Sequence, residues 1–194
     1  PANRKMSTWS SSSTGALLLN HNTLMSSLPA DVKTPLLGSS GLIDASSADF
    51  IKYLRGEEGI SNPLGETYRR RSSLIAASVN APPVFVGGRL NMGYDRSNSA
   101  VSGKTSYAGY ITDKGVAPGT IYAPTNDGQV HVINAADDTL TPPQAIKNAN
   151  GTIRPGVELW SYLMKSSLSK MEKFSNAAYD FEYVLDGPVV EGDI

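Results

Sequence analysis

Residues 120–135 read TIYAPTNDGQVHVINA, and this stretch decides the predicted fold class. Two runs rich in β-branched and aromatic residues, 120–125 and 129–135, flank the short sequence Asn126-Asp127-Gly128. Runs of this composition form strands, and an Asp-Gly pair tolerates the positive φ angles that tight hairpin turns require. The stretch therefore predicts a β-hairpin.

Further strands are predicted on both sides of this hairpin. Val84–Val86, bounded by prolines and glycines, has the composition of a short buried strand. Residues 156–162, which include Trp160, supply another strand. Residues 179–184 alternate apolar and polar side chains as a half-buried strand does, and Asp186-Gly187 predicts a second turn after them. These patterns indicate a mainly β chain.

Two short helices interrupt the predicted strands. The first lies within residues 45–56, where serines precede an apolar cluster and a glycine follows it. The second is expected from Lys165 to Ser175, because apolar residues between 164 and 174 recur at helical spacing.

Two stretches are predicted to lack regular structure. Residues 1–45 are rich in serine and glycine and are expected to form an irregular approach segment. Residues 89–119 are expected to form a long surface insertion, within which 107–111 is compatible with a strand or a helical turn. This insertion carries Tyr94, Tyr107 and Tyr110, which are our candidates for contact with an external surface.

Composition excludes several functional classes. The formal net charge of -1 gives no basic excess of the kind that nucleic-acid binders show. The absence of cysteine excludes disulfides, thiolate metal sites and a cysteine nucleophile. No apolar run is long enough to span a bilayer, and no signal peptide is visible. We expect both ends to be cuts through a longer, exported protein.

Each conspicuous residue has a structural alternative to a functional role. Asp127 is placed to stabilise its turn rather than to act as a catalytic acid, and two unclustered histidines, one of them His131, do not predict a zinc site. Asp137-Asp138 and Asp186 are compatible with a calcium shell but more typical of solvated turns. The arginines at 69–71 are compatible with an anionic partner or with surface ion pairs.

The hairpin and the Glu-Leu-Trp run at 158–160 together resemble one repeat of quinoprotein-like β-propellers. In such repeats the Asp-Gly turn joins adjacent strands of a blade and the tryptophan packs between blades. The order of the flanking segments, from about residue 49 onward, is similar to the opening of the C-terminal propeller in the PilC/PilY family of type IV pilus adhesins. The segments that carry this likeness are 53–56 (YLRG), 68–74 (YRRRSSL), 79–87 (VNAPPVFVG), 126–131 (NDGQVH), 158–162 (ELWSY) and 183–187 (YVLDG).

The resemblance implies a fold, a boundary and a set of signature residues. The fold is part of a β-propeller with short helical insertions and long loops. Residues 1–45 form the irregular approach segment that precedes the propeller, and residues 46–194 form the incomplete N-terminal part of the propeller domain. The structural signature residues are Asn126, Asp127, Gly128, His131, Trp160, Asp186 and Gly187.

The sequence departs from the family at three positions. Arg55-Gly56-Glu57 replaces a common Arg-Gly-Asp triplet, so integrin-type binding is not carried over. The calcium loop of the family is missing and is expected beyond residue 194. Residues 74–78 replace a usual acidic pair, which indicates a divergent member or a relative.

The function that the resemblance implies is non-enzymatic. It comprises type IV pilus assembly and stabilisation and attachment to a host or abiotic surface, with minor pilins as partners, at the pilus tip or cell surface. No catalytic residue and no cofactor are expected in this segment. Two alternatives remain open, a quinone-cofactor dehydrogenase and a periplasmic or outer-membrane scaffold propeller.

Overall fold

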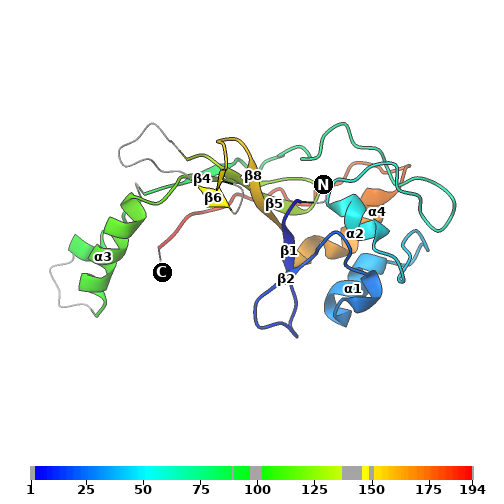
Figure 1. The fold of residues 1–194 in the computed structure, drawn as a ribbon, viewed down its shortest axis with the longest axis horizontal. Coiled ribbons are helices and arrows are strands. Elements are labelled where there is room, and N and C mark those ends of the chain that lie inside the picture. The colour runs from blue at the N-terminus through cyan, green and yellow to red at the C-terminus, as the bar shows by residue number, and fades with distance from the viewer. Residues whose placement is uncertain (1–2, 89, 97–101, 137–145, 149–150, 194) are drawn as a thin grey trace.

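The structure is a computed structural model that describes residues 3–88, 90–96, 102–136, 146–148 and 151–193. Its main element is a six-stranded sheet in the order β2-β1-β8-β5-β4-β3 (Figure 1). Neighbouring strands are antiparallel except β1 and β8, which are parallel. The strands are β1 (Met6–Trp9), β2 (Ala16–Leu18), β3 (Val84–Val86), β4 (Thr120–Pro124), β5 (Gln129–Asn134) and β8 (Glu158–Leu163). A separate ribbon pairs β6 (Lys147–Asn148) with β7 (Gly151–Thr152).

The predicted hairpin is confirmed as β4 and β5, which pair from Thr120 opposite Asn134 to Pro124 opposite Val130. The turn is closed by two backbone hydrogen bonds, one from the Gly128 amide to the Thr125 carbonyl and one from the Thr125 amide to the Gln129 carbonyl. Gly128 has a φ of 77°, the conformation that the Asp-Gly pair predicted. The hairpin thus provides the two strands that lie between β8 and β3 in the sheet.

Short helices gather at one end of the sheet (Figure 1). They are η1 (Met25–Ser27), α1 (Ala30–Leu37), α2 (Asp49–Leu54), η3 (Lys165–Lys170) and α4 (Met171–Ser175). α2 confirms the helix predicted within residues 45–56. η3 and α4 together confirm the helix predicted from Lys165 to Ser175, although its first half is a 3-10 helix.

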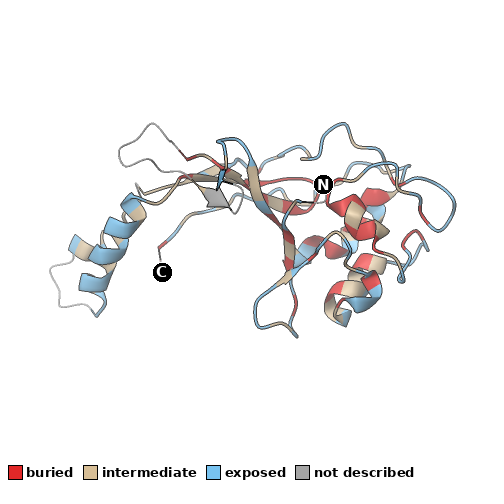
Figure 2. Ribbon diagram, viewed as in Figure 1, coloured by how far each residue is buried: buried red, intermediate tan, exposed pale blue. Residues whose placement is uncertain are grey.

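The main hydrophobic core lies among these helices and the ends of β1 and β8, where buried residues concentrate (Figure 2). Phe50, Tyr53 and Tyr68 stack together there, with ring centroids 5.1 to 6.3 Å apart. Met6 from β1 and Leu163 from β8 join the same cluster. The sheet and the helices are therefore held together by one apolar cluster.

The irregular segment predicted for residues 1–45 is corrected by the structure. This stretch contains β1, β2, η1 and α1, and it contributes Leu19, Met25 and Val32 to the core. The serine-rich composition concealed these elements because the hydroxyl groups find partners that are distant in the sequence. Thr8 donates to the Leu163 carbonyl at 2.8 Å, and Ser10 donates to Asp31 at 2.7 Å. The domain boundary at residue 45 stays a prediction.

Two strand predictions are also corrected. Val84–Val86 forms a strand, but it is an edge strand with Phe85 54% exposed rather than a buried one. Residues 179–184 form no strand, and the Asn126 side chain binds two of their backbone groups. It donates to the Glu182 carbonyl at 2.5 Å and accepts from the Val184 amide at 2.7 Å. Gly187 lies at a bend in the same irregular segment.

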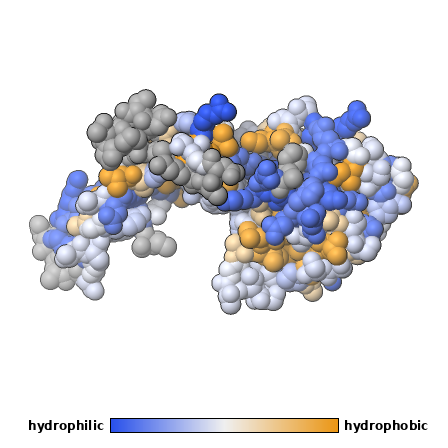
Figure 3. All heavy atoms as spheres, viewed as in Figure 1, coloured by the Kyte–Doolittle hydropathy of each residue, from blue (hydrophilic) through white to orange (hydrophobic). Residues whose placement is uncertain are grey.

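The predicted insertion contains an arm at the opposite end of the molecule from the helical core (Figure 1). The arm is formed by η2 (Tyr94–Arg96) and by α3 (Lys104–Gly115), a helix rather than a loop. No residue of α3 is buried, and the surface of the arm is mostly hydrophilic or neutral (Figure 3). A helix without a buried apolar face gains little from packing, so its few side-chain contacts determine its position.

The predicted mainly β architecture is thus confirmed. It consists of a mixed, open sheet with few helices. β2 and β3 form the two edges of this sheet within the described part of the chain.

The two Asp-Gly pairs give a matched test of the turn. A Cβ added at Gly128 would lie 2.7 Å from the Ser167 Cβ and 2.9 Å from the Met171 Cε, whereas one at Gly187 would meet nothing within 4 Å. We expect Gly128→Ala to lower the free energy of unfolding by about 2–4 kcal/mol, through left-handed backbone strain and overpacking. Gly187→Ala should change it by less than about 0.5 kcal/mol. Equal losses in urea unfolding would refute this account of the turn.

Candidate functional site

A buried network of charged side chains lies beneath the hairpin turn. Arg4 donates from Nε and Nη2 to both carboxylate oxygens of Glu158 at 2.8 to 3.0 Å. Glu158 Oε1 lies 3.1 Å from His131 Nδ1, and both Asp127 oxygens lie 3.3 Å from His131 Nε2. His131 and Asp127 are fully buried. The network therefore links the start of the chain to β5, β8 and the turn between β4 and β5.

Electrostatics favour the protonated form of His131. Burial alone lowers the pKa of this imidazole, but hydrogen bonds to Asp127 and Glu158 outweigh burial, and the pKa lies above its ordinary value of 6.5. Burial likewise opposes ionisation of Asp127 and Glu158, yet their contacts with His131 keep both carboxyl pKa values lowered. Arg4 Nη2 lies 2.9 Å from His131 Nδ1, and this neighbouring cation opposes protonation of the imidazole. Glu158 Oε1 lies within hydrogen-bond distance of both groups and moderates their repulsion.

Gln129 and Arg55 complete the network. Gln129 accepts from Ser161 Oγ at 2.8 Å and donates to the Leu54 carbonyl at 3.3 Å. Arg55 is 2% exposed and donates to the backbone carbonyls of Leu19 and Arg4. These bonds join β5 to β8 and to the end of α2, and they join Arg55 to the segments that hold Leu19 and Arg4. The Asp127–His131 pair is closed to solvent, so it is suited to structural support rather than to proton transfer with a substrate.

Asp127 has the role in the turn that the sequence indicated. Its Oδ1 accepts from the Thr125 hydroxyl at 2.5 Å and from the Gln129 amide at 3.3 Å. Asp186, the other signature aspartate, is exposed.

Trp160 lies on a face of β8 that the described residues cover only in part. The indole is 38% exposed and meets the Tyr122 ring edge to face, with centroids 6.1 Å apart. Packing of this tryptophan against another blade stays a prediction.

The three candidate contact tyrosines come together on the arm. Tyr107 lies between the others, with ring centroids 5.1 Å from Tyr94 and 5.9 Å from Tyr110. Tyr94 and Tyr110 are each about half exposed. Asp193 anchors the group, because it accepts from the Tyr107 hydroxyl at 2.7 Å and pairs with Lys114 at 2.6 Å.

These contacts change the ionisation of the groups that make them. Lys114 and Tyr107 lower the pKa of the Asp193 carboxyl, so this anchor is ionised at neutral pH. The pKa of Tyr107 is raised, first by burial and then by Asp193. The arm is therefore joined to the last described residues of the chain by charge-assisted hydrogen bonds.

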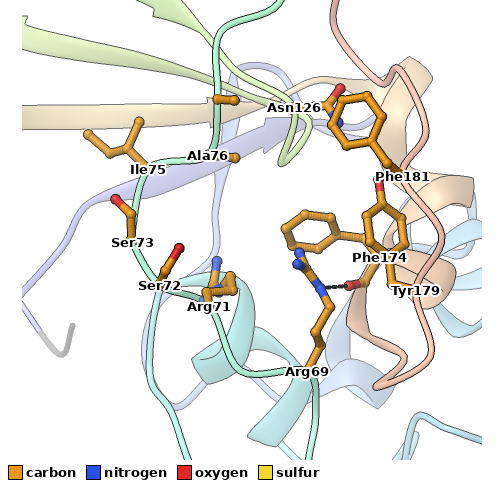
Figure 4. Close-up of a pocket in the computed structure, with 11 residues that line it drawn as sticks. Arg69, Arg71, Ser72, Ser73, Ile75, Ala76, Asn126, Phe174, Tyr179 and Phe181 are labelled. Atoms are coloured by element: carbon orange, nitrogen blue, oxygen red, sulfur yellow. Dashed lines mark hydrogen bonds between the residues drawn. The ribbon is translucent and has the colours of Figure 1, made fainter.

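A separate pocket of about 230 Å³ opens between residues 69–77 and the segment that follows α4 (Figure 4). Arg69 and Arg71 form its base, and Phe174, Tyr179 and Phe181 form its aromatic wall. The Arg69 guanidinium lies 4.4 Å from the Phe174 ring centre and 4.7 Å from that of Tyr179. Arg69 Nε also donates to the Phe174 carbonyl at 2.9 Å.

Arg71 lies deeper and is incompletely paired. Its guanidinium is 4.6 Å from the Tyr53 ring centre, and its Nη2 donates to the Tyr53 carbonyl. Its Nε and Nη1 are screened from solvent and have no hydrogen-bond acceptor among the described residues. Neither Arg69 nor Arg71 forms an ion pair with a carboxylate in that part of the chain.

Within the described ranges, no group of three or more acidic, histidine or cysteine side chains is arranged to hold a metal ion. Asp137-Asp138, the acidic pair considered for calcium, lies outside those ranges. The helices there include none that is long and apolar enough to cross a bilayer.

Sequence reasoning missed Arg4, Glu158 and the arginine pocket. Arg4 and Glu158 are separated by 154 positions, and no local pattern connects them. The run of three arginines was visible, but the aromatic wall comes from a segment about 100 positions later, so the pocket could not be assembled from spacing alone.

Comparison with known proteins identifies one informative similarity. The chain is 25% identical over 158 residues, 81% of its length, to a type IV pilus biogenesis factor PilY1 homolog of Xylella fastidiosa. The match covers 11% of that relative, so the chain corresponds to a small part of the curated protein. No protein-family model matches the chain. No solved structure matches it either. The similarity supports a relationship to type IV pilus biogenesis factors.

The buried network predicts a pH-dependent contribution to stability. Because the pKa of Asp127 is lowered, its contribution is present above its ordinary value of 3.8 and is lost as pH falls through the folded pKa. Because the pKa of His131 is raised, its contribution is complete below 6.5 and is lost as pH rises through the folded pKa. The interaction of the pair should therefore be strongest between these two values.

Substitution of Asp127 tests this window. Near pH 6, Asp127→Asn should lower the free energy of unfolding by about 3 kcal/mol, since it leaves a buried cation short of a partner. The loss should shrink as the pH is raised well above neutrality. The exposed Asp186→Asn is the matched control and should change stability by less than about 0.5 kcal/mol. A loss that is the same at every pH in urea unfolding would contradict a charged Asp127–His131 pair.

Proposed function

We propose that this chain is a non-enzymatic segment of a type IV pilus biogenesis factor and acts in pilus assembly and surface attachment. The observation that carries the proposal is the similarity to the PilY1 homolog across most of the chain. The family resemblance of the hairpin and Trp160 segments points the same way. Its partners in this proposal are minor pilins, and its location is the pilus tip or cell surface of an exported protein.

We propose that the open sheet is one part of a propeller. The edges formed by β2 and β3 and the half-exposed Trp160 are groups that adjoining strands or blades would cover. Exposed sheet edges are normally protected in soluble proteins, and radial closure is one way to protect them. No cofactor is proposed for this segment, and calcium is proposed for the remainder of the protein.

The arm is the part of the segment best suited to touch a surface. It projects away from the helical core (Figure 1) and carries three neighbouring tyrosines, two of them half exposed. Tyrosine supplies a large amphipathic contact area at low cost in side-chain entropy. The two ends of the arm approach each other, because a Cβ on Gly88 would lie 2.5 Å from the Gly115 Cα. The chain therefore leaves and re-enters the sheet at neighbouring positions, so the arm can be removed without separating β3 from β4.

Removal of residues 90–116 from the chromosomal gene tests the proposal. We expect attachment of cells to a surface to fall about tenfold, because exposed tyrosines are frequent energetic centres of interfaces. Pilus number, counted by electron microscopy, should show whether assembly also depends on the arm. If both attachment and piliation equal those of the parent strain, the proposed role of the arm is wrong.

Point variants separate contact from folding. The double substitution Tyr94→Ser and Tyr110→Ser removes the two exposed rings. It also removes the 3.3 Å hydrogen bond from the Tyr110 hydroxyl to Asp193, but the shorter contacts of Tyr107 and Lys114 still hold that carboxylate. Leu64→Ser is the control, since Leu64 is 59% exposed in a loop outside the arm. The tyrosine variant should lose attachment with normal protein levels, and the leucine variant should retain it.

A further inference from the structure

We propose that the arginine pocket binds the side-chain carboxylate of an acidic residue in a peptide segment of a partner protein. The pocket is defined by Arg69, Arg71, Ser72, Ser73, Phe174 and Phe181 (Figure 4). The proposal does not depend on the pilus role, because it rests on the chemistry of these side chains.

Unmatched positive charge is the first argument. Arg69 and Arg71 line one small pocket, and no carboxylate among the described residues pairs with either. Asp127 is the acid whose charge acts on Arg71, and it is already bound by His131 and Thr125. Burial lowers the pKa of the Arg71 guanidinium, and the smaller effects of Arg4 and Arg69 act in the same direction.

Unused hydrogen-bond donors are the second argument. Arg71 Nε and Nη1 are hidden from solvent without an acceptor. A buried donor without an acceptor costs free energy, and a carboxylate that displaces the groups covering these two nitrogens would supply the acceptor. Rings hold both arginines, Arg69 against Phe174 and Tyr179 and Arg71 against Tyr53. The guanidinium groups are therefore positioned before a ligand arrives, which lowers the entropic cost of binding.

The walls of the pocket favour a peptide over an inorganic anion. Phe181, on the aromatic side of the pocket, is more than half exposed. Its ring meets that of the exposed Tyr183, which is outside the lining, edge to face with centroids 5.3 Å apart. Such rings gain by covering apolar groups that flank the acid, which a phosphate ion lacks. On the other side, residues 72–76 belong to no strand, and their backbone groups make no hydrogen bond in the described chain. Free backbone groups of this kind can pair with the main chain of a passing peptide.

Four peptide or ion probes test the proposal by isothermal titration of the 194-residue chain. The first is acetyl-Ala-Leu-Asp-Ala-Leu-amide, and the second has Asn in place of Asp. The third has Asn and a free terminal carboxylate, and the fourth is inorganic phosphate. We expect the affinity for the Asp peptide to be at least about tenfold higher than that for the Asn peptide, because the carboxylate forms a charge-assisted hydrogen bond.

Arginine variants locate the binding. Arg71→Gln should weaken the Asp peptide about tenfold, and Arg71→Lys, which keeps the charge but loses the planar fork, should fall between. Arg70→Gln is the matched control, because Arg70 is exposed and does not line the pocket, and it should change the affinity by less than about twofold. If Arg71→Gln does not fold, Arg69→Gln takes its place. NMR then follows the backbone amide shifts of Ser72, Ser73 and Phe181 in the parent chain as the Asp peptide is added.

Four results would overturn the proposal. They are equal affinity for the Asp and Asn peptides, binding of the free terminal carboxylate alone, phosphate binding at least as tight as that of the Asp peptide, and an equal loss with Arg70→Gln and Arg71→Gln.

Discussion

The rest of the structure depends on the buried ion network in which Glu158 joins Arg4 to His131 and His131 joins Asp127. Charges removed from water are costly unless each finds a partner, and here every carboxylate contacts a cation. The network connects the beginning of the chain to the hairpin turn and to β8. It therefore fixes the only parallel pairing of the described sheet, between β1 and β8, in which the Ser161 amide donates to the Lys5 carbonyl.

Different interactions hold the two ends of the molecule on either side of this network. At one end, helices pack on Met6 and Leu163 and form an apolar core. At the other end, α3 buries no residue and is positioned by Asp193 through Tyr107 and Lys114. Polar contacts therefore decide where the arm lies, whereas apolar packing decides where the helices lie. The surface of the arm is not committed to the core, which is why the proposed function assigns recognition to it.

Local signals in the sequence were sufficient for the hairpin and for the helices α2 and η3–α4. The Asp-Gly turn and the spacing of apolar residues depend only on neighbouring positions. Residues 1–45 were predicted to be irregular because short elements rich in serine lack a strong period, yet Thr8 and Ser10 bury their hydroxyl groups against distant partners. The alternation at 179–184 suggested a strand, but the side chain of Asn126 binds that segment instead. The ion network and the arginine pocket require contacts across more than 100 positions, which no local pattern encodes.

The protonation state of His131 tests the central claim most directly. In a uniformly ¹⁵N-labelled chain, NMR detects both imidazole nitrogens and follows them through a pH titration. A charged network predicts that both nitrogens of His131 carry protons at pH values where a free histidine is neutral, with a midpoint above 6.5. Arg4→Gln should leave both nitrogens protonated, because Asp127 and Glu158 remain. A neutral imidazole at and below pH 6.5 would contradict the account.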